Sequence, residues 1–563
     1  MPFASTMRAA SVRTFVTTLS TTTSLHLLLT RTNSFSPLLS RHNIHLSSAL
    51  QMASSTSWPE LQTASELTAV GNALTLDAQL RKTGYGSPHV SNTLRLFDKP
   101  ATYKPLITLY RDEAGWCPYC EKTIMLIEEK KIPCFVSVVP MRSYGDKPAE
   151  FLKLVPNGLL PALVIEDEVT GAKKTITESQ VIMEILDGMH PVSEGYVAML
   201  PDRGDEDGWQ RTQVLARLER ELFGAWCGLI FRPEMGGLSG GLAALQNLLP
   251  GNAIEEANPS PAMKSFIAVL DKVDTELRYT PGPWFFESDH PLMIDLIFVS
   301  HIERMLASCA HWKGLQIRGS GRWKGIDAWF DAFDQRESYL AFKSDFYTNI
   351  MDIPPQYGPG YDGGFESKRK EYSSALLGKD GKSWNLPLSP DVELEPLFKG
   401  PPLNPVALEA AGITDYTNAD QHVMQKACRQ HAGWKLASNG ENVSKFAARG
   451  GSKGASNNRK RFQAPLADPY ANPDTSIQSY VSSALQIVCR TLLDDAAKTD
   501  EEHDEVLAAG KSDLVSSVPS AARSDVANSL AYVRDRVGVP RDMPLAAARQ
   551  FRAHLNWAIS SLK

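Results

Sequence analysis

The sequence predicts an α/β domain, then an all-helical domain, then a mostly helical C-terminal extension. Short β-type runs alternate with helical stretches between residues 105 and 187, and from residue 208 to about 350 the apolar residues recur with a helical period. A Gly- and Pro-rich break at 354–364 precedes a further helical region. A length of 563 residues agrees with several cores, because one domain averages about 150 residues.

The α/β domain is expected over residues 103–192, with four short strands bounded by turn residues. These strands are PLITLY (105–110), CFVSVV (134–139), LPALVI (160–165) and KKTIT (173–177). Helical stretches are expected at 118–131, 148–154 and 179–187. Because a helix separates the first two strands, we expect them to pair in parallel, whereas the last two are close enough to form a hairpin.

The all-helical domain is expected over residues 205–352 and the extension over 366–563. Segments such as VLARLERELFGAWCGLIF and MKSFIAVLDKVDTELRY combine an apolar stripe with charged residues, which is typical of amphipathic helices. Within the extension, residues 450–474 are polar and rich in Gly, Ser and Asn, so we expect an exposed linker. A charged face or a partner site is the alternative for this stretch.

The first 52 residues have the composition of an organelle transit peptide, and residues 53–102 are expected to form a lead-in segment. No Asp or Glu occurs before residue 60, whereas Ser, Thr and Leu are frequent and four arginines are present (Arg8, Arg13, Arg31, Arg41). Import into the chloroplast is favoured, with the mitochondrion as the alternative and an unstructured cytosolic tail as a further one. Cleavage would remove four positive charges, leaving a net charge of −10.

Composition excludes several classes of protein. A net charge of −6 gives no electrostatic reason to expect nucleic-acid binding, and no apolar run reaches the roughly 18 residues that span a bilayer. Seven scattered cysteines are too few for a disulfide-stapled scaffold. We therefore expect no nucleic acid and no membrane among the partners.

A Cys-Pro-Tyr-Cys motif lies where the first predicted strand leads into the first predicted helix. Cys117 falls at the helix N-cap, where free backbone N–H groups and the helix dipole favour thiolate over thiol. Pro118 fits the first helical position, and Cys120 is placed to resolve a mixed disulfide at Cys117. Cys117 and Cys120 are therefore the predicted catalytic pair, with Cys117 as the attacking residue.

Structural zinc is the main alternative for the two cysteines. A closed zinc site needs four ligands, usually from a second CxxC or a pair of histidines, and the sequence offers neither. A CxxC within a βαβ pattern is instead a redox motif. We therefore predict no metal.

Two further stretches are candidates for ligand binding. Pro161 begins a strand after the Gly158-Leu159-Leu160 turn, where a cis peptide could present the backbone of the preceding residue to an extended thiol peptide. An ordinary trans proline is the alternative. Glu178 and Ser179 open a helix, where a hydroxyl and free N–H groups can hold a carboxylate, or simply cap the helix.

Taken together, WCPYC, the GLLP turn and the Glu178–Ser179 pair resemble the glutathione transferase superfamily over residues 103 to 355. The resemblance implies a thioredoxin-like domain followed by the superfamily's all-α C-terminal domain. A cysteine at the nucleophile position is similar to the cysteine-containing classes. The intact CPYC, the targeting segment and the long extension are most similar to the iota class of photosynthetic organisms. One departure is Leu292, which stands where the second domain's cap hydroxyl usually precedes Asp295.

The resemblance also implies roles for individual residues. Cys117 would form the mixed disulfide, with Tyr119 beside it, and Leu160 before Pro161 would hold the cysteinyl backbone of glutathione. Glu178 and Ser179 would hold the γ-glutamyl end of glutathione. Lys147 would approach its glycyl carboxylate.

The predicted function is a glutathione-dependent thiol transferase or oxidoreductase. Its cofactor is glutathione, and its partners are glutathione, an oxidised or glutathionylated small molecule or protein, and a second copy of the chain as a homodimer. Conjugation of electrophiles is expected to be weak, because a cysteine nucleophile would trap glutathione as a mixed disulfide. The alternatives are a ligand-binding protein and a redox-regulated partner-binding protein with the same fold.

Overall fold

The computed structural model describes residues 56–141, 144–233, 259–388, 400–454, 466, 468–497 and 499–563. The chain divides into two units, Met1–Ala49 and Leu50–Lys563, and every described residue belongs to the second. The transit peptide predicted at 1–52 lies outside the described residues.

A five-stranded sheet in the order β1-β3-β2-β4-β5 forms the centre of the α/β domain. The strands are β1 (Leu94–Arg95), β2 (Ile107–Asp112), β3 (Cys134–Val139), β4 (Ala162–Glu166) and β5 (Lys173–Ile176). The parallel pairing of β2 with β3 and the β4–β5 hairpin are both confirmed. β1, which pairs antiparallel with β3, was not predicted because two residues are too few to show a period.

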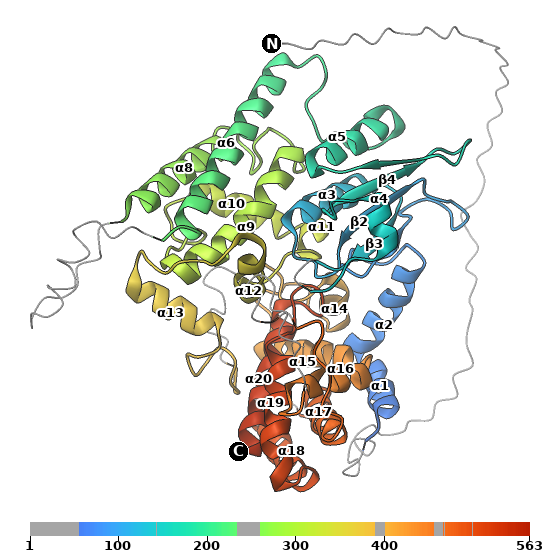
Figure 1. Cartoon of the computed structure of the whole chain (residues 1–563), viewed down its shortest axis with the longest axis vertical. Helices are drawn as coiled ribbons and strands as arrows, with labels where there is room; N and C mark the ends of the chain where they lie inside the picture. The colour runs from blue at the N-terminus through green and yellow to red at the C-terminus, as the bar shows by residue number, and fades with distance from the viewer. Residues whose placement is uncertain are drawn as a thin grey trace, which may run out of the picture. The chain divides into compact units, whose positions relative to one another are not determined.

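Helices α3 (Pro118–Lys130), α4 (Ala149–Leu154) and α5 (Ser179–Met189) cover the sheet on its two faces (Figure 1). Ile124 of α3 and Ile182 of α5 share one core with Leu109 of β2. Tyr110 points to the other face, where its ring lies 5.5 Å from that of Phe151 in α4. Side chains of β2 thus alternate between the two faces of the sheet. A short loop leads from the end of β2, the central strand, to the N-terminus of α3.

The all-helical region follows the α/β domain directly. Its helices are α6 (Glu206–Ile230), α8 (Pro261–Leu277), α9 (Met293–Lys313), α10 (Lys324–Phe333), α11 (Glu337–Leu340) and α12 (Phe346–Tyr357). The break predicted at 354–364 begins too early, because α12 continues through Pro354 and Pro355 to Tyr357. The α/β domain and these helices share one hydrophobic core, in which α9 is buried nearly all round.

The start of α9 shows how a leucine can occupy the cap position. Asp295 accepts a hydrogen bond from the backbone N–H of Leu292 at 2.9 Å, which is one half of a capping box. The carboxylate also accepts from the indole N–H of Trp329 at 2.9 Å. The helix is therefore fixed by Asp295 without a cap hydroxyl.

The extension is helical, as predicted, and it includes two helices from the other end of the described chain. Its helices are α13 (Glu366–Leu376), α14 (Pro405–Ala410), α15 (Gln421–Ala437), α16 (Gly440–Ala447), α17 (Gln478–Leu492), α18 (Asp500–Ser517), α19 (Arg523–Arg534) and α20 (Leu545–Leu562). Helices α1 (Trp58–Leu67) and α2 (Ala69–Lys82) lie beside α15 and α16 (Figure 1). They contribute Trp58, Leu61, Val70 and Leu74 to the extension's core. The predicted lead-in segment is thus partly a component of the C-terminal region.

The linker predicted at 450–474 is not exposed at its ends. Gly450 packs against Tyr532, and Asp474 is 3% exposed. The hydroxyl of Tyr470 donates to Asp146 of the α/β domain at 2.7 Å. Residues 455–465 and 467 lie outside the described residues.

Helix α12 and the residues just before it form one of the contacts between the helical domain and the extension. Asp345 caps α12 and forms a buried ion pair with Arg552 of α20 at 3.0 Å. Ser344 donates to the carbonyl of Val539 at 2.7 Å, and Tyr347 donates to the carbonyl of Asp535 at 3.1 Å. The extension is therefore attached to a helix that also reaches the CPYC motif, as described below.

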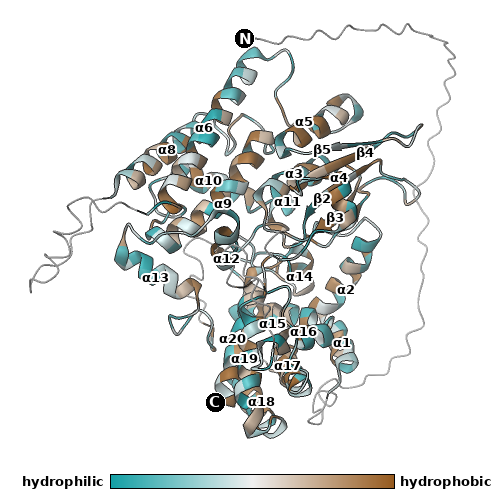
Figure 2. Cartoon of the chain, in the orientation of Figure 1, coloured by the Kyte–Doolittle hydropathy of each residue, from teal (hydrophilic) through white to brown (hydrophobic). Residues whose placement is uncertain are grey.

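Hydrophobic residues follow the strands and the inward sides of helices such as α5, whereas α13 is mostly hydrophilic (Figure 2). Among the described helices, none combines the length and the apolar character needed to cross a bilayer.

Candidate functional site

Cys117 lies at the N-cap of α3, directly after the loop that leaves β2. Its backbone is extended (φ −60°, ψ 117°), and Pro118 takes the first helical position. Cys117 is half-buried, whereas Cys120 is completely buried one turn into the helix. The predicted pair is thus brought together, with the predicted nucleophile as the accessible member.

Asp112, the last residue of β2, fixes the loop that carries Cys117. One of its carboxylate oxygens accepts from the backbone N–H of Trp116 at 2.7 Å and from that of Cys117 at 3.2 Å. Asp112 is 1% exposed. The carboxylate therefore holds the two residues before α3 in place and occupies their free N–H groups.

The pKa values of the two thiols move in opposite directions. A hydrogen bond from the side chain of Cys120 lowers the pKa of Cys117, and hydrogen bonds from the backbone N–H groups of Cys120 and Tyr119 lower it further. Burial and the negative charge of Asp112 act in the opposite direction. Burial and the neighbouring Cys117 raise the pKa of Cys120 well above its ordinary value. Cys117 is therefore the more acidic thiol of the pair, and so the one that loses its proton more readily.

The other five cysteines have raised pKa values, and burial is the main cause in each. Burial raises the pKa of Cys227 to about 11 and that of Cys428 to about 12, and it also raises the pKa values of Cys134, Cys309 and Cys489. All seven cysteines of the chain are free thiols. Cys117 is thus the thiol that combines partial exposure with a lowered pKa.

Tyr119 and Lys122 lie on the first turn of α3 beside Cys117. The Tyr119 hydroxyl is hydrogen-bonded to that of Tyr357 at the end of α12, and burial raises the pKa of Tyr119. Lys122 is buried, with its ammonium 5.3 Å from the centre of the Tyr119 ring. Burial lowers the pKa of Lys122 to about 8, although the charges of Glu219, Cys117 and Glu178 oppose this. A positive charge therefore lies between the nucleophile and the start of α5.

The Leu160–Pro161 peptide bond is cis, so the first of the two alternatives considered for Pro161 is confirmed over a trans proline. Within the described residues, the backbone N–H and C=O of Leu160 form no backbone hydrogen bond. The stem of Lys147 packs over Gly158 in the same turn, and its ammonium donates to the carbonyl of Pro140 at 2.9 Å. Burial lowers the pKa of Lys147, with the charges of Cys120 and Cys117 acting against it.

Glu178 and Ser179 begin α5, as predicted. Glu178 is exposed and adopts φ 70° and ψ 103°, a left-handed conformation that costs a non-glycine residue about 1–3 kcal/mol. Ser179 is buried at the first position of the helix.

Trp116 is held by two helices of the helical domain. Its indole N–H donates to Asn349 of α12 at 2.9 Å, and its carbonyl accepts from the guanidinium of Arg304 in α9. Arg304 also forms a buried ion pair with Glu121 of α3. Both domains therefore determine where Cys117 lies.

Asp352 of α12 is a buried carboxyl close to this loop, and one of its oxygens lacks a hydrogen-bond partner among the described residues. Burial raises the pKa of Asp352 to about 7, against the opposing charge of Arg541. An unfolded aspartate releases its proton near pH 3.9, so the folded state binds more protons between pH 4 and 7 and loses stability as the pH rises through that window.

We expect Asp352→Asn to remove this loss. The gain in unfolding free energy over the wild type should be near zero at pH 4 and grow to about 1–3 kcal/mol at pH 7. Urea unfolding at both pH values measures it. An equal effect at the two pH values would contradict a buried, proton-binding Asp352.

Asp112, Cys117 and Cys120 form a group that could hold a metal ion. One ligand atom from each lies within 4.8 Å of the others. Structural zinc requires a fourth ligand. Any ion held by these three residues would need a further ligand from outside the group.

Several residues of the site were not predicted from the sequence. Asp112 could have been found as a carboxylate at the end of a buried strand, and Arg304 as a charge within a helix that is otherwise apolar. The Nδ1 of His301 is hydrogen-bonded to a carboxylate oxygen of Glu219 at 2.6 Å. Its ring packs edge-on against that of Tyr119, with the ring centres 5.3 Å apart. Asn349 and Tyr357 carry no sequence pattern, because their role depends on how α12 packs against α9 and so reaches Trp116 and Tyr119.

Comparison with known proteins identifies the domain that carries the motif. Residues 116–189 match the family model described as the glutathione S-transferase N-terminal domain. Over 80 residues, 14% of the chain, the sequence is 30% identical to glutathione S-transferase DHAR3, chloroplastic, of Arabidopsis thaliana and covers 28% of that protein. It is 29% identical to the probable glutathione S-transferase DHAR2, chloroplastic, of Oryza sativa subsp. japonica, with 26% of that protein covered. The chain thus spans about a quarter of the length of these curated relatives.

Solved structures also align with the chain at low identity. A Chlamydomonas reinhardtii dehydroascorbate reductase aligns with 44% of this chain and 97% of its own, at 16% identity and a TM-score of 0.31. Glutathione transferase Omega 3C from Trametes versicolor aligns with 43% of this chain and 91% of its own, at 20% identity and a TM-score of 0.32. The predicted resemblance to the glutathione transferase superfamily is confirmed as a distant similarity, and the thioredoxin-like domain followed by helices is confirmed as the fold.

Proposed function

We propose that this chain, which carries a glutathione S-transferase N-terminal domain, is a glutathione-dependent thiol transferase. The observation that supports the proposal most directly is the asymmetry of the CPYC pair. Cys117 is half-buried at a helix N-cap with a lowered pKa, and its hydrogen-bonded partner Cys120 is buried with a raised pKa. This is the arrangement of an attacking and a resolving thiol.

The proposed cycle has two thiol–disulfide exchanges. The Cys117 thiolate attacks the glutathione sulfur of a mixed disulfide, so that a Cys117–glutathione disulfide forms and the substrate leaves as its thiol. A second glutathione thiolate then attacks the glutathione sulfur of that disulfide, which gives oxidised glutathione and restores the Cys117 thiolate. Overall, one glutathione and the substrate mixed disulfide are converted into the substrate thiol and oxidised glutathione, so one disulfide is broken for each one formed.

The glutathione subsite is proposed along the edge formed by the cis-proline turn and α5. The unpaired backbone of Leu160 would pair with the cysteinyl residue of glutathione in the manner of a short strand. The N-terminus of α5 at Glu178 and Ser179, with Lys122 nearby, suits the γ-glutamyl carboxylate. Lys147 would reach the glycyl carboxylate only by leaving the carbonyl of Pro140.

The class and the location of the protein are part of the same proposal. We propose the iota class, because an intact CPYC, an acid-free N-terminal segment and a long helical extension occur together in this chain. The composition of residues 1–52 supports import into the chloroplast.

The activity itself is tested with the full chain and the mixed disulfide of glutathione and 2-mercaptoethanol. We expect glutathione-dependent reduction of this disulfide and little conjugation of an aryl halide. Strong conjugation without disulfide reduction would contradict a redox role. Absence of both activities would favour the ligand-binding alternative.

A second test concerns the pKa of Cys117. We expect its rate of alkylation by iodoacetamide to reach half its maximum below pH 8.5, about the value for an unperturbed cysteine. Cys120→Ala should move this midpoint to higher pH, because it removes the side-chain hydrogen bond that lowers the pKa of Cys117 most. Mass spectrometry of the modified peptide measures the rate. A midpoint that Cys120→Ala leaves unchanged would assign the lowered pKa to the helix N-terminus alone.

A further inference from the structure

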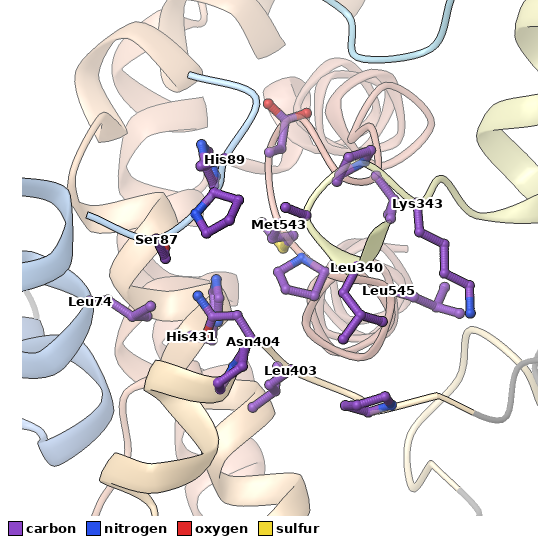
Figure 3. Close-up of a pocket in the computed structure, with 18 of the residues that line it drawn as sticks. Leu74, Ser87, His89, Leu340, Lys343, Leu403, Asn404, His431, Met543 and Leu545 are labelled. Atoms are coloured by element: carbon purple, nitrogen blue, oxygen red, sulfur yellow. The ribbon is translucent and has the colours of Figure 1, made fainter. Parts of the chain in front are cut away.

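A partly open cavity of about 120 Å³ lies where α2, the loop before β1, the helical domain and the extension meet (Figure 3). Its walls come from residues 87–91, 337–344, 401–405, 431–435 and 539–545, together with Leu74 and Arg81 of α2. None of the residues assigned to the thiol-transfer site lines it. The cavity is therefore separate from the proposed function.

Most of the wall is apolar. The close-up in Figure 3 shows leucine and methionine side chains around the cavity, and six prolines also line it. The labelled apolar residues are Leu74, Leu340, Leu403, Met543 and Leu545. A cavity of about 150 Å³ with such a lining binds benzene in an engineered protein. This cavity is somewhat smaller, so its size limits the apolar part of a ligand to about one ring.

His431 supplies an unpartnered polar atom in this wall. The residue is 4% exposed, and its Nδ1 has no hydrogen-bond partner among the described residues. Burial lowers the pKa of His431 to about 3, with the positive charges of Lys435 and Arg81 adding to the effect. The imidazole is therefore neutral at physiological pH, and one tautomer places an N–H donor at Nδ1.

Lys435, one helical turn after His431 on α15, supplies an uncompensated positive charge. Its ammonium has no hydrogen bond and no ion pair within 4 Å in the described part of the chain, although Asp542 lies close enough to affect its pKa. Three other charged residues of the wall are already paired, whereas Glu337 is exposed. These pairs are Arg81–Asp77 at 3.1 Å, Lys343–Asp334 at 2.8 Å and Arg541–Asp542 at 2.7 Å.

We propose that this cavity binds a small monocarboxylate with an apolar body of about one ring. One negative charge matches the one unpaired ammonium, and the Nδ1–H of His431 gives the carboxylate a second donor. The apolar wall receives the body of the acid. A phosphate dianion would carry a second charge for which this wall offers no unpaired cation.

Isothermal titration calorimetry of the full chain with benzoate tests the proposal, and benzamide is the neutral ligand of the same shape. We expect saturable binding of benzoate with one site per chain and at least about tenfold weaker binding of benzamide, because the charge-assisted hydrogen bond is lost. Lys435→Met should weaken the binding of benzoate by a similar factor. Lys445→Met, which removes an exposed lysine of the neighbouring helix α16, should leave it unchanged.

His431→Phe should fill the cavity and abolish benzoate binding, whereas His431→Asn, which keeps a donor, should retain part of it. Unchanged circular dichroism and unchanged reduction of the glutathione mixed disulfide show that each variant is folded. Equal affinities for benzoate and benzamide, equal effects of Lys435→Met and Lys445→Met, or no binding by the wild type would each overturn the proposal.

Discussion

Cys117→Ser is expected to reduce glutathione-dependent turnover of a small glutathionylated disulfide by at least about a thousandfold. A hydroxyl at the N-cap of α3 stays protonated near neutral pH and forms no disulfide, so the first exchange cannot begin. The other cysteines offer no substitute, because burial raises their pKa values. Steady-state kinetics of the full chain measures the loss.

Cys120→Ser is the matched control, because it makes the same atom change one turn away. Glutathione can release the product from Cys117 directly, so we expect this variant to keep its activity within about tenfold of the wild type. Loss of turnover in both variants would show that the cycle needs both thiols. Full activity in Cys117→Ser would overturn the assignment of the nucleophile.

Arg304→Met is expected to cost about 3–5 kcal/mol of unfolding free energy, the usual range when one partner of a buried ion pair is removed. The substitution leaves the Glu121 carboxylate buried without its cation. It also frees the carbonyl of Trp116, which precedes the nucleophile. We therefore expect turnover to fall in the fraction that remains folded, and urea unfolding followed by kinetics measures both effects.

Two further variants test whether the cost in stability comes from the buried ion pair or from the loss of any arginine side chain. Arg322→Met breaks the exposed pair with Asp271 in the same domain and should change stability by less than about 1 kcal/mol. Adding Glu121→Gln to Arg304→Met should recover much of the lost stability, because the unpaired carboxylate is then gone. An equal cost for Arg304→Met and Arg322→Met would contradict the role assigned to the buried pair.

The sheet and its helices could be predicted because their residues follow local rules. The run CFVSVV forms β3 with the predicted limits, and the Ser179 helix begins at the predicted residue. α12 passes through Pro354 and Pro355, a continuation that a Pro-rich sequence argues against. The helices within residues 53–102 were missed because their apolar faces pack on the extension, and the sequence of 58–82 does not reveal that partner.

The core of the candidate site was predictable for the same reason, and its surroundings were not. CPYC, the cis-proline turn and Glu178–Ser179 are contiguous motifs whose chemistry follows from their place at strand and helix ends. Arg304 and Asn349 act on Trp116 from helices far along the chain. Contacts of that kind depend on the packing of α9 against α3 and of α12 against α9, which no spacing in the sequence encodes.

The sharing of one core by α1, α2 and the C-terminal helices sets the order in which this chain can fold during synthesis. All residues of the first core, from Val90 to Leu377, have been made before α14 and the later helices of the extension. The second core joins Trp58 and Leu74 to residues as late as Leu562. The apolar sides of α1 and α2 must therefore stay uncovered on the growing chain until α14, α15 and α17, which pack on them, have been made, and an uncovered apolar surface of this kind is a site for chaperone binding.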